Sequence, residues 1–290
     1  MYATLIAVAA LWGAATGLLV PRAAYRFSVE PEDAWRDACP AGHALTGPGR
    51  GWLGPARCPA CAAAGAGATV AVPTETGGPD TGEAPEALDA PDTGDAPDTP
   101  PATLWHRHGP RYAPALLAPV VSALCCAVVA ATTGARPELA AWLLLAPVAV
   151  LLAAIDRRVH RLPDQLTLPA AGAAAALLGV AALLPEHGGS WLSALLGGVG
   201  LGAFYLLLFL VNPNGMGFGD VKLALSLGVV LGWYGWAVVF AGGFAGFLFG
   251  AVYGLALMIM RRAGRRTGIP FGPFMIAGAL LGVLLGGLAA

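Results

Sequence analysis

Long apolar runs separated by short polar segments make up most of the sequence, which is the pattern of a membrane-embedded helical protein. A helix needs about 20 apolar residues to cross the hydrocarbon core of a bilayer. Residues 232–236 combine turn-forming and interfacial side chains and divide an apolar stretch that is too long for one helix. The sequence therefore predicts an all-α, polytopic membrane helical bundle with about eight transmembrane helices. The predicted spans are residues 2–20, 113–133, 138–155, 166–184, 190–211, about 220–236, about 237–260 and 271–289.

The distribution of basic residues predicts the orientation of the chain. Arg22 is the first basic residue and directly follows the first apolar run. By the positive-inside rule, the N-terminus then faces outward and Arg22 faces the cytoplasm. Eight alternating spans place fifteen of the 16 Lys and Arg residues inside and leave only Arg136 outside. Because one missing span would invert every later loop, this asymmetry supports the number of spans.

The composition agrees with a membrane protein and excludes two other classes. The chain is 57% hydrophobic and 11% charged, whereas a soluble protein has about 25% charged residues. This excludes a soluble cytosolic enzyme. The net charge of -1 provides no basic field to attract phosphates, so nucleic acid is excluded as a partner and membrane lipid is expected instead. The 41 glycines favour close packing of membrane helices.

Three parts are predicted along the chain. Residues 1–20 form the first transmembrane helix, residues 21–112 form a cytoplasmic loop, and residues 113–290 form a seven-helix membrane core. Within the loop, residues 62–103 contain eight carboxylates and no Lys or Arg, among Ala, Gly, Pro and Thr. Such a segment cannot bury enough apolar surface to offset the entropy of ordering. It is predicted to be a disordered acidic linker, and a specific binding tail is the alternative.

Three cysteines and one histidine in the cytoplasmic loop predict a metal site within residues 39–61. Cys58 and Cys61 form a C-x2-C pair, a spacing that suits two thiolate ligands to one zinc ion. Cys39 and His43 lie four residues apart upstream and complete a Cys3His set. A closed zinc site would stabilise a loop that has no core of its own. The alternative is a set of free thiols in a mobile loop, because a reducing cytoplasm disfavours disulfides.

Few carboxylates are left once the solvated regions are excluded. Twelve of the 17 acidic residues lie in the cytoplasmic loop. Glu138 and Glu186 fall at the outer face, where we expect water to hydrate them. The three remaining acidic residues all fall at the inner ends of predicted spans: Asp156, Asp164 and Asp220.

Asp156 and Asp220 are the candidate catalytic residues. Partial desolvation at the edge of the hydrocarbon favours the protonated form of a carboxyl group. Two facing carboxyl groups can share a proton, so that one takes a proton from water while the other donates to a peptide carbonyl oxygen. Alone, each residue could be a counter-ion for a nearby arginine or an acid at a helix N-terminus. Together at one face of a bundle, they predict an aspartic active site.

Five nearby residues support this site. Gly217 and Gly219 permit a tight or positive-φ turn and leave room for an extended peptide. Lys222 either favours the ionised form of a nearby carboxylate or extends to the membrane interface. Pro163 ends one element, and Asp164 is expected to cap the helix that follows.

These motifs resemble those of the type IV prepilin peptidases, the bacterial leader peptidases of pilins and of type II secretion pseudopilins. The resemblance covers residues 138–289 well and the N-terminal part loosely. The matching segments are Asp156 followed by Arg161-Leu162-Pro163-Asp164-Gln165-Leu166-Thr167-Leu168-Pro169, then Gly217-Phe218-Gly219-Asp220-Val221-Lys222-Leu223, and Ile269-Pro270-Phe271-Gly272-Pro273-Phe274.

The resemblance implies a membrane aspartic endopeptidase that removes a short, positively charged leader after a glycine. Asp156 and Asp220 are the catalytic pair by the family's motifs, and proteolysis needs no cofactor. The implied partners are prepilin or pseudopilin precursors. The implied location is the bacterial inner membrane, with the active site at the cytoplasmic face.

The N-terminal part departs from the family pattern in two places. Many family members also N-methylate the new pilin N-terminus, using S-adenosylmethionine. Their segment after the first span reads like Gly-Ser-Phe-x-Asn, whereas residues 17–21 lack the Ser and the Asn. S-adenosylmethionine is therefore expected only if methyl transfer is retained. The family also commonly has two C-x2-C pairs, whereas Gly42 stands in the place of the fourth thiol and His43 is the candidate substitute.

The alternative from another functional class is a non-enzymatic membrane transporter or scaffold whose inner acidic residues move protons or metal ions. Charges at the bilayer midplane, or two halves with matching broken helices, would favour that function. The sequence shows neither feature, so a peptidase is the preferred interpretation.

Overall fold

The computed structural model describes residues 2–29, 33–67, 116–213, 215–260 and 270–290. Within these ranges the chain is helical without a β-strand, apart from one antiparallel bridge between Ala38 and Ala44. Eight described helices coincide with the eight predicted spans: α1 (Tyr2–Gly17), α5 (Leu117–Thr133), α6 (Glu138–Val159), α7 (Asp164–Ala181), α8 (Trp191–Val211), α9 (Phe218–Gly232), α10 (Trp236–Ile259) and α11 (Gly272–Ala289). Three more helices follow α1: α2 (Val20–Phe27), α3 (Pro48–Gly51) and α4 (Pro59–Gly67).

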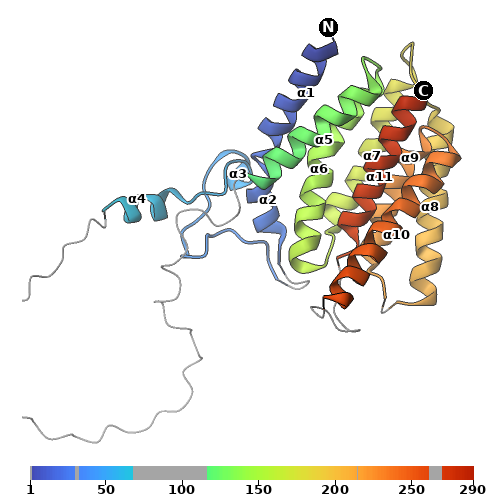
Figure 1. The fold of residues 1–290 in the computed structure, drawn as a ribbon. Helices are drawn as coiled ribbons and strands as arrows, with labels where there is room; N and C mark the ends of the chain where they lie inside the picture. The colour runs from blue at the N-terminus through green and yellow to red at the C-terminus, as the bar shows by residue number, and fades with distance from the viewer. Residues whose placement is uncertain (1, 30–32, 68–115, 214, 261–269) are drawn as a thin grey trace, which may run out of the picture.

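The prediction of an all-α, multi-pass membrane bundle is confirmed. Six of the described segments are long and apolar enough to cross a membrane, and α5 is a shorter apolar helix. The N- and C-termini lie at the same end of the bundle (Figure 1), as an even number of spans requires. The border predicted within residues 232–236 is also confirmed, because α9 ends at Gly232 and α10 begins at Trp236.

Helix α9 is the central helix of the bundle. It has 15 residues, of which ten are buried, and it packs against α7, α8, α10 and α11. At about 1.5 Å per residue it rises less than the roughly 30 Å of a hydrocarbon core. Because neighbouring helices cover it on several sides, a short helix can lie inside the bundle without exposing its ends to lipid.

Glycine allows α8 and α9 to approach closely. A Cβ atom on Gly197 of α8 would lie 2.6 Å from the carbonyl oxygen of Gly228 and 2.7 Å from the Cα atom of Gly232, both on α9. Any larger residue would force the two backbones apart. This contact agrees with the close helix packing that the glycine content predicts.

The structure differs from the predicted boundary after the first span. Helix α2 continues the first helix to Phe27, and the side chains of Arg22 and Arg26 are buried on it. Arg22 donates hydrogen bonds to the carbonyl oxygens of Leu53 (3.0 Å) and Thr46 (2.9 Å). These carbonyl groups replace water around the guanidinium group. The loop segment that contains Thr46 and Leu53 is therefore held against α2.

The structure describes only the first part of the predicted acidic linker. Residues 62–67 belong to α4 and are helical, so the expectation of disorder is wrong for them. This segment is rich in alanine, which has the highest helix propensity. Residues 68–103, on which the rest of that prediction falls, lie outside the described residues.

The expectation that water hydrates Glu138 is wrong, whereas Glu186 is exposed as predicted. The Glu138 side chain is 0% exposed, and its Oε1 atom accepts a hydrogen bond of 3.0 Å from the backbone N–H of Gly188. Glu138 is also the first residue of α6, where the helix dipole favours a negative charge. A partner 50 residues away in sequence therefore allows its burial.

We predict that Gly197→Ala lowers the unfolding free energy by about 1–3 kcal/mol, because the added methyl group overlaps the backbone of α9. Gly172→Ala on α7 is the matched control. A Cβ at Gly172 has no atom within 4 Å, and alanine favours the helix by about 1 kcal/mol. Unfolding of both variants in detergent is the measurement. Equal effects of the two substitutions would contradict the close α8–α9 contact.

Candidate functional site

Asp156 lies near the C-terminal end of α6 and is buried, with 4% of its surface exposed. Its Oδ2 atom accepts a hydrogen bond of 3.0 Å from the backbone N–H of Gly272, the first residue of α11. A Cβ atom on Gly272 would lie 2.9 Å from the same oxygen. Only a glycine therefore lets the start of α11 approach the carboxylate this closely. Gly272 is not among the residues predicted for the site, although it stands in the last matching segment.

Asp220 is the third residue of α9 and is also buried, with 8% exposed. Its Oδ2 atom accepts a hydrogen bond of 3.3 Å from the backbone N–H of Gly217, which precedes the helix. The carboxylate thus binds a free amide at the start of its own helix, where the helix dipole favours a negative charge. Both candidate acids are held in the same way, by one glycine N–H.

Gly217 and Gly219 do not adopt the positive φ that was one of their predicted roles. Gly217 has φ -75° and an extended conformation, and Gly219 is not among the described residues with positive φ. The close approach is found at Gly219, where a Cβ atom would lie 3.1 Å from the Cβ atom of Leu162. Gly219 therefore allows the segment after α6 to pack on the first turn of α9.

The two candidate acids border one apolar cluster of the bundle. This cluster includes Leu152, one turn before Asp156, and Leu223, three residues after Asp220. The carboxyl groups of Asp156 and Asp220 lie close enough to interact electrostatically. Two buried carboxyl groups that interact electrostatically can take different protonation states, with one ionised and the other protonated.

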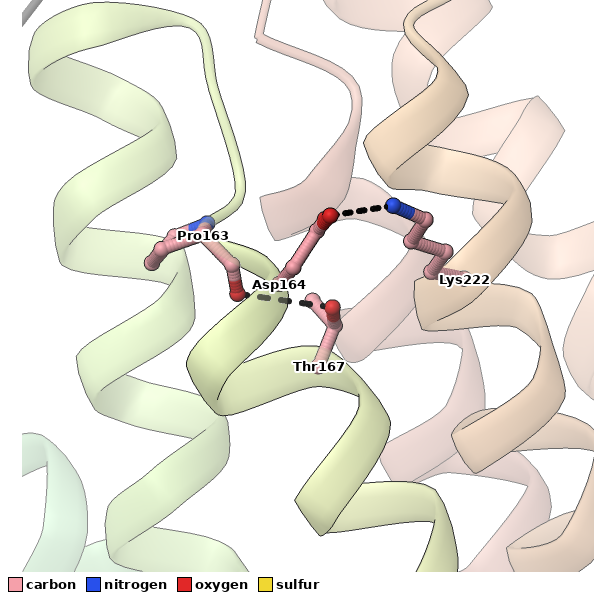
Figure 2. Close-up of polar contacts among 4 residues, drawn as sticks. All are labelled: Pro163, Asp164, Thr167 and Lys222. Atoms are coloured by element: carbon pink, nitrogen blue, oxygen red, sulfur yellow. Dashed lines mark hydrogen bonds and ion pairs between the residues drawn. The ribbon is translucent and has the colours of Figure 1, made fainter. Parts of the chain in front are cut away.

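Asp164 does not cap α7, which is its predicted role. Figure 2 shows that Asp164 lies at the start of α7 and points toward Lys222 on α9. Its Oδ2 atom lies 2.6 Å from the Lys222 Nζ atom, and Pro163 occupies the N-cap position without a side-chain cap. The helix begins one residue earlier than a capping Asp164 requires, so its carboxylate is free to bind the lysine. Of the two predicted roles of Lys222, pairing with a carboxylate is the one observed.

The four residues of the predicted metal site come together. Their ligand atoms, one from each of Cys39, His43, Cys58 and Cys61, all lie within 4.8 Å of one another. The His43 Nδ1 atom lies 3.3 Å from the Cys61 Sγ atom, 3.6 Å from that of Cys39 and 3.7 Å from that of Cys58. The cluster could therefore hold a metal ion, and His43 takes the fourth position.

Gly42 explains how His43 reaches this position. Gly42 has φ +80°, and its N–H donates a 2.9 Å hydrogen bond to the carbonyl oxygen of Cys39. The resulting tight turn folds His43 back beside Cys39. A glycine in the left-handed region at this point is favoured because it has no Cβ atom.

Neighbouring thiols of the cluster shift the pKa values of Cys58 and Cys61. Burial, together with the adjacent Cys58 and Cys39 thiols, raises the pKa of Cys61 to about 12. Burial also opposes ionisation of Cys58, but hydrogen bonds from Cys61 and Cys39 outweigh it and lower the pKa of Cys58. Three adjacent thiols cannot all ionise without a compensating positive charge, and a bound cation would supply that charge.

Comparison with known proteins identifies the part of the chain that contains the two candidate acids. Residues 143–258 match the Type IV leader peptidase family. The chain is 35% identical over 173 residues to a protein of Aeromonas salmonicida named prepilin leader peptidase/N-methyltransferase, covering 59% of this chain and 57% of that protein. A protein of the same name from Pseudomonas aeruginosa is 32% identical over 173 residues, covering 59% and 58%.

A protein of the same name from Bacillus subtilis is 36% identical over 97 residues, covering 33% of this chain and 38% of that protein. The chain thus spans little more than half the length of the first two relatives. No solved structure matches the chain. The resemblance that the sequence motifs predict is confirmed for residues 143–258, which match a type IV leader peptidase domain.

Proposed function

We propose that the chain is a membrane aspartic endopeptidase that removes the leader peptide from prepilin or pseudopilin precursors. It acts at the cytoplasmic face of the bacterial inner membrane, with its N-terminus outside. The observation that carries this proposal is the pair of buried acids, Asp156 and Asp220. They come from different helices, interact electrostatically, and each accept a hydrogen bond from a glycine N–H. Both lie within the segment that matches the leader peptidase family.

The arrangement suggests how a peptide bond would be cleaved. The Oδ2 atom of each acid is held by a backbone amide, which leaves the Oδ1 atoms to act on water and substrate. The ionised acid takes a proton from a water molecule while the water oxygen bonds to the scissile carbonyl carbon. The protonated acid donates to the carbonyl oxygen. The first acid then gives the proton that it took from water to the amide nitrogen, and the carbon–nitrogen bond breaks as the carbonyl double bond re-forms and its proton returns to the second acid. The leader is released with a free carboxyl group.

The positions of charged residues favour a peptidase over a transporter. Within the described residues, α8, α10 and α11 contain no Asp, Glu, Lys or Arg. The charged residues of α6, α7 and α9 all lie within five residues of an end of their helix. A transporter that moves ions is expected to have ionisable groups near the bilayer midplane. The two candidate acids instead lie near helix ends, Asp156 in the last turn of α6 and Asp220 in the first turn of α9.

The first test is co-expression with a prepilin and comparison of precursor size on a gel. Asp156→Asn and Asp220→Asn keep the side-chain volume but remove the acid, so each is expected to slow cleavage at least about 100-fold. Glu186→Gln, an exposed change at the other end of the bundle, is the control and should cleave normally. Normal processing by either aspartate variant would remove the proposed catalytic pair.

We further propose that the Cys3His cluster binds a structural zinc ion. Ligands at 2.0 to 2.3 Å from a tetrahedral zinc ion lie about 3.3 to 3.8 Å from one another. The separations of Cys39 Sγ from Cys61 Sγ (3.8 Å) and of His43 Nδ1 from the three thiols fit this geometry. Four protein ligands leave no open position, which is typical of a structural site. The ion would hold the loop together beside α2.

Metal analysis of the purified protein tests the zinc site. We expect one zinc ion per chain in the wild type and a loss of zinc in Cys58→Ser and His43→Ala. His43→Cys should keep the ion, because it restores a thiolate at the fourth position. Cys126→Ser, a buried cysteine on α5, is the matched control and should change nothing. Full zinc content in His43→Ala would show that another group is the fourth ligand.

Methyl transfer is the second activity in the names of the relatives. Two observations argue against it here. The segment of residues 17–21 lacks the polar Ser and Asn of the family pattern. In the structure, Pro21 stands in the first turn of α2, where it offers neither an N–H nor a polar side chain to a ligand. We therefore propose proteolysis without methylation, so that S-adenosylmethionine is not needed.

Mass spectrometry of the mature N-terminus tests the absence of methylation. The pilin processed by this chain should have the mass of the unmodified sequence, because residues 17–21 lack the Ser and the Asn of the family pattern. A prepilin processed by the Pseudomonas aeruginosa relative provides the comparison. A mass gain of one methyl group in the product of this chain would show that methyl transfer does occur.

A further inference from the structure

Helices α7 and α9 meet along a line of contacts at the inner end of the bundle. Leu162, just before α7, packs on Gly219 in the first turn of α9. Two turns further along α9, the Ser226 hydroxyl donates a 3.1 Å hydrogen bond to the carbonyl oxygen of Thr167. Both Thr167 and Ser226 are buried. This seam joins the segment that follows Asp156 to the helix that carries Asp220.

Between these two contacts lies the ion pair of Asp164 with Lys222. Among the described residues it is the one ion pair between a lysine or arginine and a carboxylate. The Lys222 side chain is 18% exposed and that of Asp164 is 56% exposed. The ammonium group also lies 4.8 Å from the ring centroid of Phe218. Lys222 thus contacts both an aromatic ring and a carboxylate, and Figure 2 shows the pair with Asp164.

Lys222 is the only lysine in the sequence, and the other fifteen basic residues are arginines. The two side chains are not equivalent. Lysine presents a compact point charge, whereas arginine presents a broad planar fork. At this position the Nζ atom contacts one Asp164 oxygen and the Phe218 ring, and a compact point charge makes both contacts without a planar fork. The single exception to the use of arginine therefore falls at the residue that joins α9 to α7.

Both members of the ion pair are connected to a candidate acid through a short stretch of backbone. Lys222 is two residues from Asp220 on the same helix. Asp164 is eight residues from Asp156 and is connected to it by the end of α6 and the short segment up to Pro163. Fastening Asp164 to Lys222 therefore fixes the inner end of α6 relative to the first turn of α9.

We propose that Lys222 and Asp164 are positioning residues, whose ion pair sets the separation of the Asp156 and Asp220 carboxyl groups. This rests on the proposed peptidase function. A partly exposed ion pair contributes little to the unfolding free energy. A misplacement of catalytic groups by about 1 Å can nevertheless slow a reaction about 100-fold. Activity and stability should therefore respond differently when the pair is broken.

The experiment measures cleavage of a purified prepilin by Asp164→Asn, by Lys222→Gln and by the exchanged pair Asp164→Lys with Lys222→Asp. Each single variant should lower kcat about 10- to 100-fold with KM unchanged. The exchanged pair should regain most of the lost kcat, which a purely structural role would not produce. Asp33→Asn, an exposed aspartate without an ion pair among the described residues, is the matched control and should keep the wild-type kcat.

Hydrogen exchange provides a measurement that does not depend on cleavage. The backbone amides of residues 160–167 should exchange about tenfold faster in each single variant and return to the wild-type rate in the exchanged pair. Unchanged exchange in the single variants would overturn the proposed clamp, whatever the activity. Wild-type kcat in the single variants, with Asp156→Asn inactive, would overturn positioning and leave the proposed function standing. An inactive wild type would refute the proposed function itself.

Discussion

Glycine permits backbone atoms to approach to distances that any side chain would prevent, and both the bundle and the candidate site depend on such approaches. At Gly197, one turn of α8 lies against the backbone of α9. At Gly272, the same property lets a backbone N–H reach the Asp156 carboxylate, and at Gly219 it lets the segment after α6 lie on α9. A buried carboxylate at the edge of a membrane needs a donor. Here the donors are main-chain amides, which need no side-chain ordering.

The sequence was sufficient for features that depend on local pattern. All eight predicted spans correspond to helices, and the border after Gly232 is correct, because apolar runs of this length have few alternative structures. The motif residues around Asp220 could likewise be selected from the sequence alone. What could not be predicted were partners that are distant along the chain. Glu138 is buried because Gly188 approaches it, and Asp164 binds Lys222 instead of capping its helix. Local patterns contain no information about such contacts.

The N-terminal segment joins the membrane bundle to the Cys3His cluster. Helix α2 packs against α6, the helix that carries Asp156. On its other side, the guanidinium groups of Arg22 and Arg26 hold the carbonyl oxygens of the loop before Cys58, and Arg26 lies 4.1 Å above the ring centroid of Trp52. The loop is thus attached to the membrane part through α2. The loop sequence contains three cysteines, the candidate ligand His43 and several glycines, and none of these indicates the attachment to α2.

Helix α6 is fixed at both of its ends. Glu138 accepts a hydrogen bond from Gly188 at the N-terminal end of α6, and Asp156 accepts one from Gly272 near its C-terminal end. A helix anchored in this way cannot slide along its axis without losing a buried hydrogen bond. Pro147 lies nine residues from each anchor and removes one main-chain hydrogen bond from the helix interior. Any rearrangement that admits a long substrate must therefore bend α6 at its midpoint or displace its neighbours sideways. Movement of α6 along its own axis would break the hydrogen bonds at its ends.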